Sequence, residues 1–418
     1  MPFFYYLSFI ILGSCLSLTT ALAEPVRFSS PDQAVAYALA NQPDLQALRE
    51  SVAEAEARAS QAGRLTNPVI GLESAGGRDF EGRIEGRFTQ PLPLNNRLAL
   101  EKQRARYEVA FARLIVAEEA RQLALQVRLT ILEQSHSIET QQLMQQRAAL
   151  ARDWLNALER SVQEGAESPL TLSKQKLVTQ ELQLDAANFE AEIIAAQSRL
   201  ARLLGLPPGS TISIPHSHSL VPVPAKRAIV SRPQLQLAEL AVEAAAMDVA
   251  LASATRWDDI VLGIFWETAR IPGDEKVENE FLAGLRVSIP LPLWQDGRPE
   301  IQEQQASEKR ARRELQAVRA NIEHEVAAAH AIMVRRHQAA TRVENELRPA
   351  TKKQLAQIEA AYQRGEVDWE AVFTARMELA LLRSRQLRQN ELYYQARLQW
   401  LHTIGALQPA TSHPYQKP

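Results

Sequence analysis

The chain has 418 residues, of which 46% are hydrophobic and 23% are charged, a balance typical of a globular protein. Its formal net charge of −2 at pH 7 gives no indication of nucleic-acid binding. The single cysteine excludes an intrachain disulfide framework and a Cys-x-x-Cys metal site.

Residues 1–23 carry no charged side chain, and residues 21–23 (Ala-Leu-Ala) form a small-x-small cleavage site. This pattern predicts a secretory signal peptide that is removed before Glu24. One alternative is an uncleaved membrane anchor, although the apolar run is shorter than the ~20 residues of a membrane helix. Another is lipidation of Cys15, which ends a loose match to a lipobox.

The first half of the mature chain changes from a helical pattern to an alternating one. Residues 31–63 have a helical composition that Pro43 interrupts, and Ser30 is placed to cap the first helix. Apolar and polar residues then alternate over about 67–75 and 82–91. This alternation predicts two strands, each with one apolar and one polar face.

A helical stretch without proline or glycine follows from Leu98 to Arg160. If continuous, it would be about 95 Å long at ~1.5 Å per residue, which suits a coiled coil or an extended tube better than a compact domain. Residues 163–169 predict a tight turn. A second helix returns from Thr171 to Leu204 and stops at Gly205.

The second half repeats this order. Its predicted elements are strands at about 259–270 and 280–290, a long helix at 299–364, a turn at 364–368 and a final helix that ends at Gly405. Pro349 is expected to break the long helix. Gly165 and Gly365 are 200 residues apart, as are Gly205 and Gly405. A constant offset indicates a tandem duplication, whose unit is too long for a solenoid repeat.

The duplication divides the chain into five parts. These are a signal peptide (1–23), a first repeat (24–209), a linker (210–228), a second repeat (229–405) and a C-terminal tail (406–418).

The four predicted strands would make a sheet that is marginal alone, with Ile260, Trp266, Phe281 and Ile289 on its apolar face. Helices could cover this face. Alternatively, sheets from several subunits could close into a barrel that has no free edges and turns its apolar face to lipid. The export signal, the strand lengths and the two long helices favour the barrel, which the helices would continue as a tube.

Each strand pair runs through a Pro-Leu-Pro-Leu sequence into a long helix. The prolines at these strand-to-helix junctions are Pro91, Pro93, Pro290 and Pro292. With the two tip turns and the Leu-Leu-Gly-Leu sequence at 203–206, they make the chain resemble TolC-type outer-membrane efflux factors of Gram-negative bacteria over about 31–405. The sequence at 290–294 is most similar to the CzcC-like branch, which serves heavy-metal efflux pumps.

This resemblance implies a homotrimer that is mostly α-helical with a small β part. Three copies of four strands would form a 12-stranded outer-membrane β-barrel, continued by a long periplasmic α-helical barrel. The implied partners are a periplasmic adaptor (membrane fusion protein) and an inner-membrane transporter, expected to be of the RND type. The channel would lie in the lipid of the cell outer membrane and extend into the periplasm.

The same resemblance implies a conduit for substrate, expected to be divalent heavy-metal cations, with no cofactor and no enzymatic activity. Drug or solvent efflux and type I secretion are alternatives on the same scaffold. A periplasmic coiled-coil scaffold without a pore is an alternative of another class, in which helices would cover the strands.

In the family, the helical hairpins turn at the periplasmic tips and dock the adaptor there. The residues that the resemblance places at these tips are Gly165, Ala166, Glu167, Ser168, Gly365, Glu366 and Val367. Tyr362 matches a tyrosine that holds the closed entrance in the family. Val367 and Thr171 stand where its basic and acidic partners are usual, so the familiar network is not reproduced.

Asp368 and Glu370 could instead supply a ring of carboxylates at this gate that favours cations. The alternative is an ordinary helix start with N-terminal acids. Trp266, Phe281 and Trp294 are expected as membrane-belt aromatics, with packing against a helix as the alternative. His324, His330 and His337 recur near one helical face without a defined further ligand, so no metal site is predicted.

Overall fold

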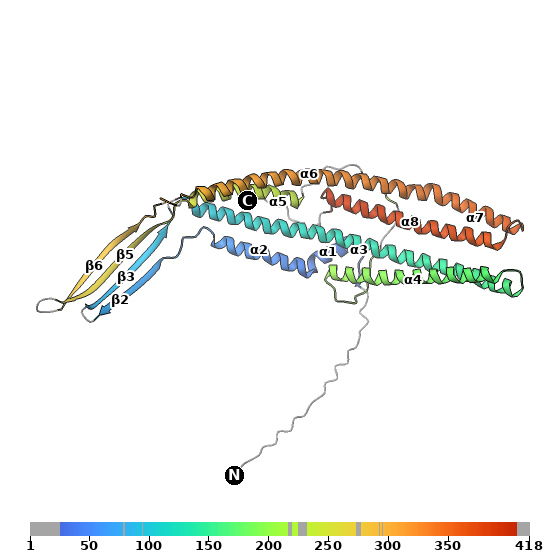
Figure 1. The fold of residues 1–418 in the computed structure, drawn as a ribbon, viewed down its shortest axis with the longest axis horizontal. Helices are drawn as coiled ribbons and strands as arrows, with labels where there is room; N and C mark the ends of the chain where they lie inside the picture. Colours follow the sequence, from blue (N-terminus) through green and yellow to red (C-terminus); the bar gives the residue numbers. More distant parts are fainter. Residues whose placement is uncertain are drawn as a thin grey trace, which may run out of the picture.

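A computed structural model of the chain describes residues 26–407 except 78–79, 94, 216–219, 225–231, 273–276, 292 and 295. The predicted signal peptide, Cys15 and Pro292 therefore lie outside the described residues. The described part is elongated, with a sheet at one end and long helices that run from it to two hairpin turns at the other end (Figure 1).

The elements of the first half are α1 (Pro31–Asn41), α2 (Pro43–Gln61), β2 (Val69–Gly77), β3 (Phe80–Leu92), α3 (Arg97–Gln163) and α4 (Pro169–Leu204). The predicted cap is confirmed, because the Ser30 hydroxyl accepts a hydrogen bond of 3.2 Å from the Gln33 N–H. α3 is continuous over 67 residues, which makes it about 100 Å long at ~1.5 Å per residue.

The elements of the second half are α5 (Pro233–Thr255), β5 (Ile260–Pro272), β6 (Val277–Ser288), α6 (Arg298–Arg342), a π-helical segment (Val343–Leu347), α7 (Arg348–Gln363) and α8 (Trp369–Thr403). The predicted break at Pro349 is wrong, because the helical run continues through it. The π-helical turn directly before α7 relieves the clash between a proline ring and the carbonyl one turn earlier.

One short strand lies within the segment predicted as a linker. β4 (Ile212–Ser213) pairs in parallel with β1 (Val26–Arg27), with Val26 opposite Ile212. Strands of two residues are too short to show an alternating pattern, so no local pattern predicts this pairing. The pair ties the start of the described chain to the segment that follows α4.

The remaining strands form one antiparallel sheet in the order β2-β3-β5-β6. The two halves of the chain meet at β3 and β5, where Phe88 lies opposite Ile264. Paired residues share a face, so this register gathers large apolar side chains on one side. This apolar sheet face consists of Ile70, Leu72, Ile84, Phe88, Leu262, Ile264, Trp266, Phe281, Leu285 and Val287.

The apolar sheet face is open. Each of its side chains is at least 36% exposed. No described helix packs against any of the four strands, and the sheet projects beyond the ends of the helices (Figure 1). The alternative in which helices cover the strands is therefore wrong for this chain.

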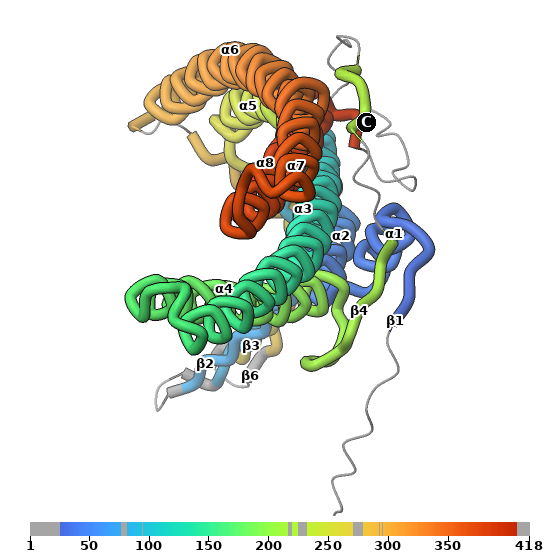
Figure 2. The backbone as a smooth tube through the Cα atoms, turned by 90° about the vertical axis from the view of Figure 1, so that its right-hand side faces the viewer, coloured from blue at the N-terminus to red at the C-terminus, as the bar shows by residue number. Residues whose placement is uncertain are grey.

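The described helices pack around four separate apolar clusters instead of one compact core, and two of the clusters show the pattern. α1, α3 and α4 enclose a core that includes Leu39, Val127 and Leu204. α3, α6 and α8 enclose a second core around Met333 and Trp400. Viewed from the hairpin end, the helices follow an open arc (Figure 2). None of the described helices has an apolar stretch long enough to cross a membrane.

Candidate functional site

The two hairpin turns at the far end of the helices have the same backbone structure. Gly165 and Gly365 both adopt a φ of +75°, a left-handed conformation that glycine reaches without steric cost. The Gly165 N–H bonds to the Val162 carbonyl at 3.1 Å, and the Gly365 N–H to the Tyr362 carbonyl at 2.9 Å. Glycine ends both helices for the same reason, which is why these turns were predictable.

The helices that leave these turns begin with side-chain caps. Ser168 accepts a hydrogen bond of 3.2 Å from the Leu170 N–H at the start of α4. Asp368 accepts one of 3.0 Å from the Ala371 N–H at the start of α8. The helix-start interpretation of Asp368 is thus confirmed, and its carboxylate remains exposed beside the turn.

A cleft of about 560 Å³ lies between the two hairpins next to their turns. The first hairpin contributes Trp154, Ala157, Leu158, Ser161 and Glu167, and the second contributes Tyr362, Asp368, Trp369 and Glu370. The structure thus brings together three of the four predicted gate residues. Thr171 is not part of the cleft, and neither are the docking residues other than Glu167.

Aromatic rings shape this tip cleft. The Tyr362 ring packs edge-on against Trp369, with 5.6 Å between their centroids. The Arg376 guanidinium lies 5.3 Å from the Trp369 ring centroid and donates a hydrogen bond of 2.8 Å to Glu359. Trp369 therefore does more than pack within the helix. In the sequence, its position directly after Asp368 already indicated that it lies beside the tip turn.

Another acidic residue at the tips, Glu366, is paired with a neighbouring arginine. Arg364 donates hydrogen bonds of 2.6 Å and 2.8 Å to the two Glu366 carboxylate oxygens. These bonds lower the pKa of Glu366 below its usual range and raise the pKa of Arg364. Glu366 lies outside the tip cleft, and the carboxylates that line the cleft are those of Glu167, Asp368 and Glu370.

At the other end of the helices, both predicted strand-to-helix junctions are present. Pro91 lies within β3 opposite Val261, and Pro93 follows the strand. Two contacts fix the first junction: the Asn95 side-chain amide donates to the Ala254 carbonyl at 2.5 Å, and Arg97 pairs with Asp259 at 2.8 Å. Pro290 follows β6 at the second junction, whereas Pro292 lies outside the described residues.

The predicted belt aromatics divide into two sets. Trp266 and Phe281 belong to the apolar sheet face, and Trp294 lies past the end of β6 with 92% of its surface exposed. The Trp266 ring lies over Gly86, where an added Cβ would approach the ring to 2.2 Å. Glycine at this position lets the ring lie flat on the neighbouring strand.

The other face of the sheet carries cross-strand charges. Arg83 lies 3.6 Å from Glu267, and Arg87 pairs with Glu73. Charged and apolar side chains therefore alternate along each strand, so that the sheet has one charged face and one apolar face. Strands that separate lipid from water show this pattern.

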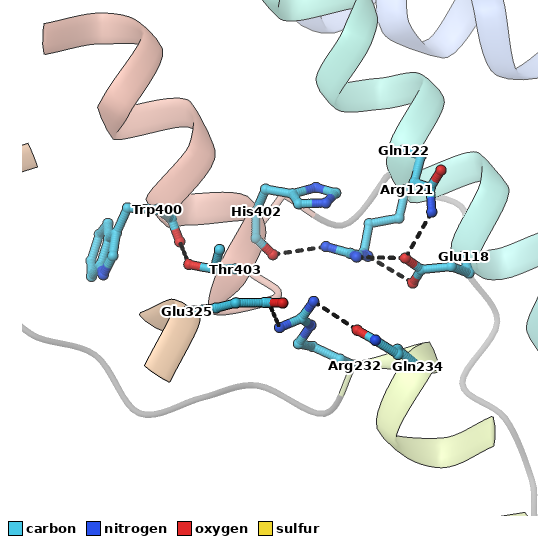
Figure 3. Close-up of polar contacts among 9 residues, drawn as sticks. All are labelled: Glu118, Arg121, Gln122, Arg232, Gln234, Glu325, Trp400, His402 and Thr403. Carbon is cyan, nitrogen blue, oxygen red and sulfur yellow. Dashed lines mark hydrogen bonds and ion pairs between the residues drawn. The ribbon is translucent and has the colours of Figure 1, made fainter. Parts of the chain in front are cut away.

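Midway along the helices, buried polar side chains join distant parts of the chain (Figure 3). Arg121 on α3 is 3% exposed and bonds to Glu118 at 2.6 Å. Arg232, just before α5, is 4% exposed and pairs with Glu325 on α6 at 3.0 Å. Sequence reasoning missed this cluster, because only contacts between distant helices bury the two arginines.

His402, in the last turn of α8, also belongs to this cluster, because its carbonyl accepts a hydrogen bond from Arg121. Burial, reinforced by the charge of Arg121, lowers the pKa of His402 from 6.5 to about 4. Burial alone would raise the pKa of Glu118, but the hydrogen bond and charge of Arg121 outweigh it and lower that pKa. The cluster thus keeps Glu118 charged and His402 neutral near pH 7.

The described residues contain no group of three or more His, Cys, Asp or Glu side chains arranged to hold a metal ion. His330 packs against Trp400 and His337 against Tyr393, with ring centroids 5.8 Å and 5.0 Å apart.

Comparison with protein families gives a match to the second half of the chain. Residues 225–406 match the family described as outer membrane efflux protein. No curated protein matches the chain by sequence.

Solved structures of outer membrane channels match nearly the whole chain. MtrE of Neisseria gonorrhoeae, in its open state, gives a TM-score of 0.74 with 13% identity over 92% of this chain and 91% of its own. CusC gives 0.71 with 19% identity over 90% and 92%. VceC of Vibrio cholerae gives 0.71 with 17% identity over 90% and 96%.

These matches show that the fold of these solved channels extends over both halves of the chain. The matched family and structures are transport channels and not enzymes. The predicted mostly helical fold with a small β part is confirmed.

Proposed function

We propose that three copies of this chain form an outer-membrane channel that conducts substrate out of the periplasm. The observation that carries the proposal is the open apolar sheet face. A four-stranded sheet with two free edges, β2 and β6, and large apolar side chains on one side is unstable in water. Closing with two other sheets pairs both edges and turns the apolar face to lipid and the charged face to the pore.

The helices then continue the pore away from the membrane. α3 and the run from α6 to α7 extend to the tips, and the open arc of helices becomes a closed tube when three copies meet (Figure 2). Pro91, Pro93, Pro290 and Pro292 mark the change from barrel to tube. The tips would dock a periplasmic adaptor, which joins the channel to an inner-membrane transporter of the RND type.

Divalent heavy-metal cations are the substrates that we infer. The CzcC-like sequence at 290–294 supports this choice. The carboxylates of Glu167, Asp368 and Glu370 in the tip cleft also support it, since a ring of them in a trimer would attract cations at the entrance. Tyr362, which packs on Trp369 beside them, would act as the movable part of the gate.

Expression of the full chain in a Gram-negative host tests the channel directly. We expect trimers in the outer-membrane fraction that dissociate on heating, and stepwise conductance after reconstitution in planar bilayers. A monomer in the soluble periplasmic fraction that gives no conductance would contradict the proposal and support a scaffold without a pore.

Cargo and partners need separate measurements. A deletion strain should lose tolerance to zinc, cobalt or cadmium, and the adaptor and transporter should co-purify with the tagged channel. Unchanged metal tolerance together with lost tolerance to an organic drug or solvent would replace metal efflux by drug efflux. Loss of a secreted protein would instead indicate type I secretion.

A further inference from the structure

Helix α4 carries two seams on opposite sides. The first is buried against α3 and α1 and includes Thr179, Leu182, Ala196 and Leu200. The second repeats at alternating steps of three and four residues, which is the spacing of a helix that packs in a coiled coil. We call it the outer seam of α4, and it consists of Leu170, Ser173, Leu177, Gln180, Leu184, Ala187, Ala191 and Ile194.

The outer seam is exposed along its whole length. Its four large apolar side chains, those of Leu170, Leu177, Leu184 and Ile194, are 79%, 61%, 63% and 62% exposed. Among the described elements, only α1, α3 and β4 pack against α4. A regular apolar seam about 36 Å long, at ~1.5 Å per residue, is costly to leave in water and fits a partner helix.

The place of α4 in the fold indicates which helix this partner is. Near the tips the described helices pack in the order α4-α3-α8-α7, so α4 and α7 are the two free ends of the series. The arc has α4 on one side and α7 with α8 on the other (Figure 2). The sheet has the same arrangement, with β2 and β6 at its free edges. A rotation that pairs β6 of one copy with β2 of the next also brings α7 of the first to α4 of the second.

The two free ends carry opposite charges at the same level of the tube. Both tip turns lie at one end of the molecule, so the distance from Gly165 or Gly365 gives the level along each helix (Figure 1). Residues 177–194 carry four acidic side chains and no lysine or arginine. Residues 336–353, at the matching distance from Gly365, carry five basic and two acidic side chains. These charges favour α7 beside α4 and disfavour two copies of α4 beside each other.

Two pairs of residues define the register of this contact. Leu184 follows Gly165 by 19 residues, and Leu347, which is 44% exposed, precedes Gly365 by 18 residues. Glu192 and Arg336 lie 27 and 29 residues from the same glycines. Both are exposed, and neither forms an ion pair with another described residue. Apolar and charged partners thus match at the same two levels.

We propose that the outer seam of α4 packs against the α6–α7 edge of a second copy of this chain as an antiparallel coiled coil. In this contact Leu184 lies beside Leu347 of the partner subunit, and Glu192 lies beside Arg336 of the partner subunit. The inference rests on the proposed trimer and adds a contact far from the sheet edges. It seals the wall of the tube near the tips, where the sheet cannot hold neighbouring copies together.

Paired cysteines in the full-length protein from outer membranes test the register. Leu184→Cys is combined with Leu347→Cys and, in separate variants one turn to either side, with Val343→Cys or Ala350→Cys. A disulfide needs Cα atoms within ~7 Å. At least one pair should therefore link about half of the chains or more on oxidation, in a ladder that ends at three chains because the contact is head-to-tail around a ring.

The controls use the same seam at the wrong level. Leu170→Cys with Leu347→Cys should give no disulfide, because Leu170 lies about 20 Å nearer the tips than the matching level. Each single cysteine variant should also remain unlinked. The wild-type protein controls for Cys15, the one native cysteine.

Two further sets of variants test the chemistry of the contact. Leu177→Asp with Leu184→Asp should lower the fraction of trimer in detergent at least about 10-fold, whereas Ile115→Asp on α3, at a side chain 46% exposed, should not. Glu192→Arg should lower the fraction of trimer about 5-fold at low salt, and adding Arg336→Glu should restore it.

Conductance of the same preparations separates this inference from the proposed function. Trimers that conduct but cross-link at none of the three pairs overturn the seam alone and leave α4 to another partner, such as the adaptor. Covalent dimers of Leu184→Cys alone would place α4 against α4 and overturn it too, as would equal linking of the Leu170 control. Protein that forms no trimer and conducts no current overturns the seam and the channel together. If the aspartate variant fails to fold, the cysteine pairs still decide.

Discussion

The Arg121 guanidinium donates a hydrogen bond of 2.8 Å to the His402 carbonyl oxygen, although the two residues are 281 positions apart. Arg121 lies on α3 in the first half of the chain, and His402 lies in the last turn of α8 in the second half. The same guanidinium also pairs with Glu118. One buried cation therefore joins the two halves and adds a second donor to a helix-end carbonyl that also accepts from the Gly405 N–H at 3.0 Å.

Replacing Arg121 by methionine should destabilise the protein by about 2 kcal/mol, because it leaves the partly buried carboxylate of Glu118 without its cation. Thermal unfolding of the purified trimer, followed by circular dichroism, measures the change. Arg113→Met is the control: Arg113 and Glu56 form an ion pair whose side chains are 61% and 51% exposed, and its loss should change stability by less than about 1 kcal/mol. Equal effects of the two variants would contradict the role given to Arg121.

Stability should fall as the pH drops from about 6.5 towards 4. The pKa of His402 is about 4 in the folded chain, against an ordinary value of 6.5, so the unfolded chain binds more protons in this window. After allowance for partial solvent exposure, the effect at pH 4 is about 1 kcal/mol. His402→Gln should flatten this part of the stability curve, measured as melting temperature against pH. An unchanged slope in the variant would assign the pH dependence to other groups.

The regular parts of this fold were predictable because their signals are local. Neighbouring residues alone determine these signals. They are the absence of proline and glycine from a long helix, the glycine at each left-handed turn, and the alternation along β3 or β5. The break predicted at Pro349 was wrong because proline is expected to interrupt a regular α-helix. Here a π-helical turn directly before α7 accommodates the proline, and the helical run continues. The pairing of β1 with β4 could not be predicted, because strands of two residues show no alternating pattern.

The candidate sites were predictable only in part, because they depend on contacts between distant segments. Tyr362, Asp368 and Glu370 were found through the turn beside them, but Trp154 reaches the same cleft from the other hairpin. Arg121 looks like any surface arginine in sequence, and only the packing of α3 against α8 buries it.

The two faces of β6 should respond differently to the same added charge. Leu285→Arg places a cation on the apolar sheet face, where we expect a cost of about 2–4 kcal/mol in lipid and a loss of membrane insertion. Leu282→Arg, three residues earlier and 55% exposed on the charged face, should insert normally. The yield of heat-dissociable trimers in outer membranes measures both. Similar loss in the two variants would contradict the assignment of the faces.

The tip cleft should set the ion preference of the channel. Neutralising both carboxylates with Asp368→Asn and Glu370→Gln removes six charges from a trimer, so the cation-to-anion permeability ratio should fall at least about 3-fold. Asparagine still caps a helix, so the bond to the Ala371 N–H that begins α8 is kept and the turn should not unfold. Reversal potentials in a salt gradient across a planar bilayer measure the ratio. Glu366→Gln is the control at the same tip, because this carboxylate is paired with Arg364 outside the cleft. A ratio that falls as much in the control as in the double variant would show that charge anywhere on the tips suffices, and the cleft would lose its role as the selective entrance.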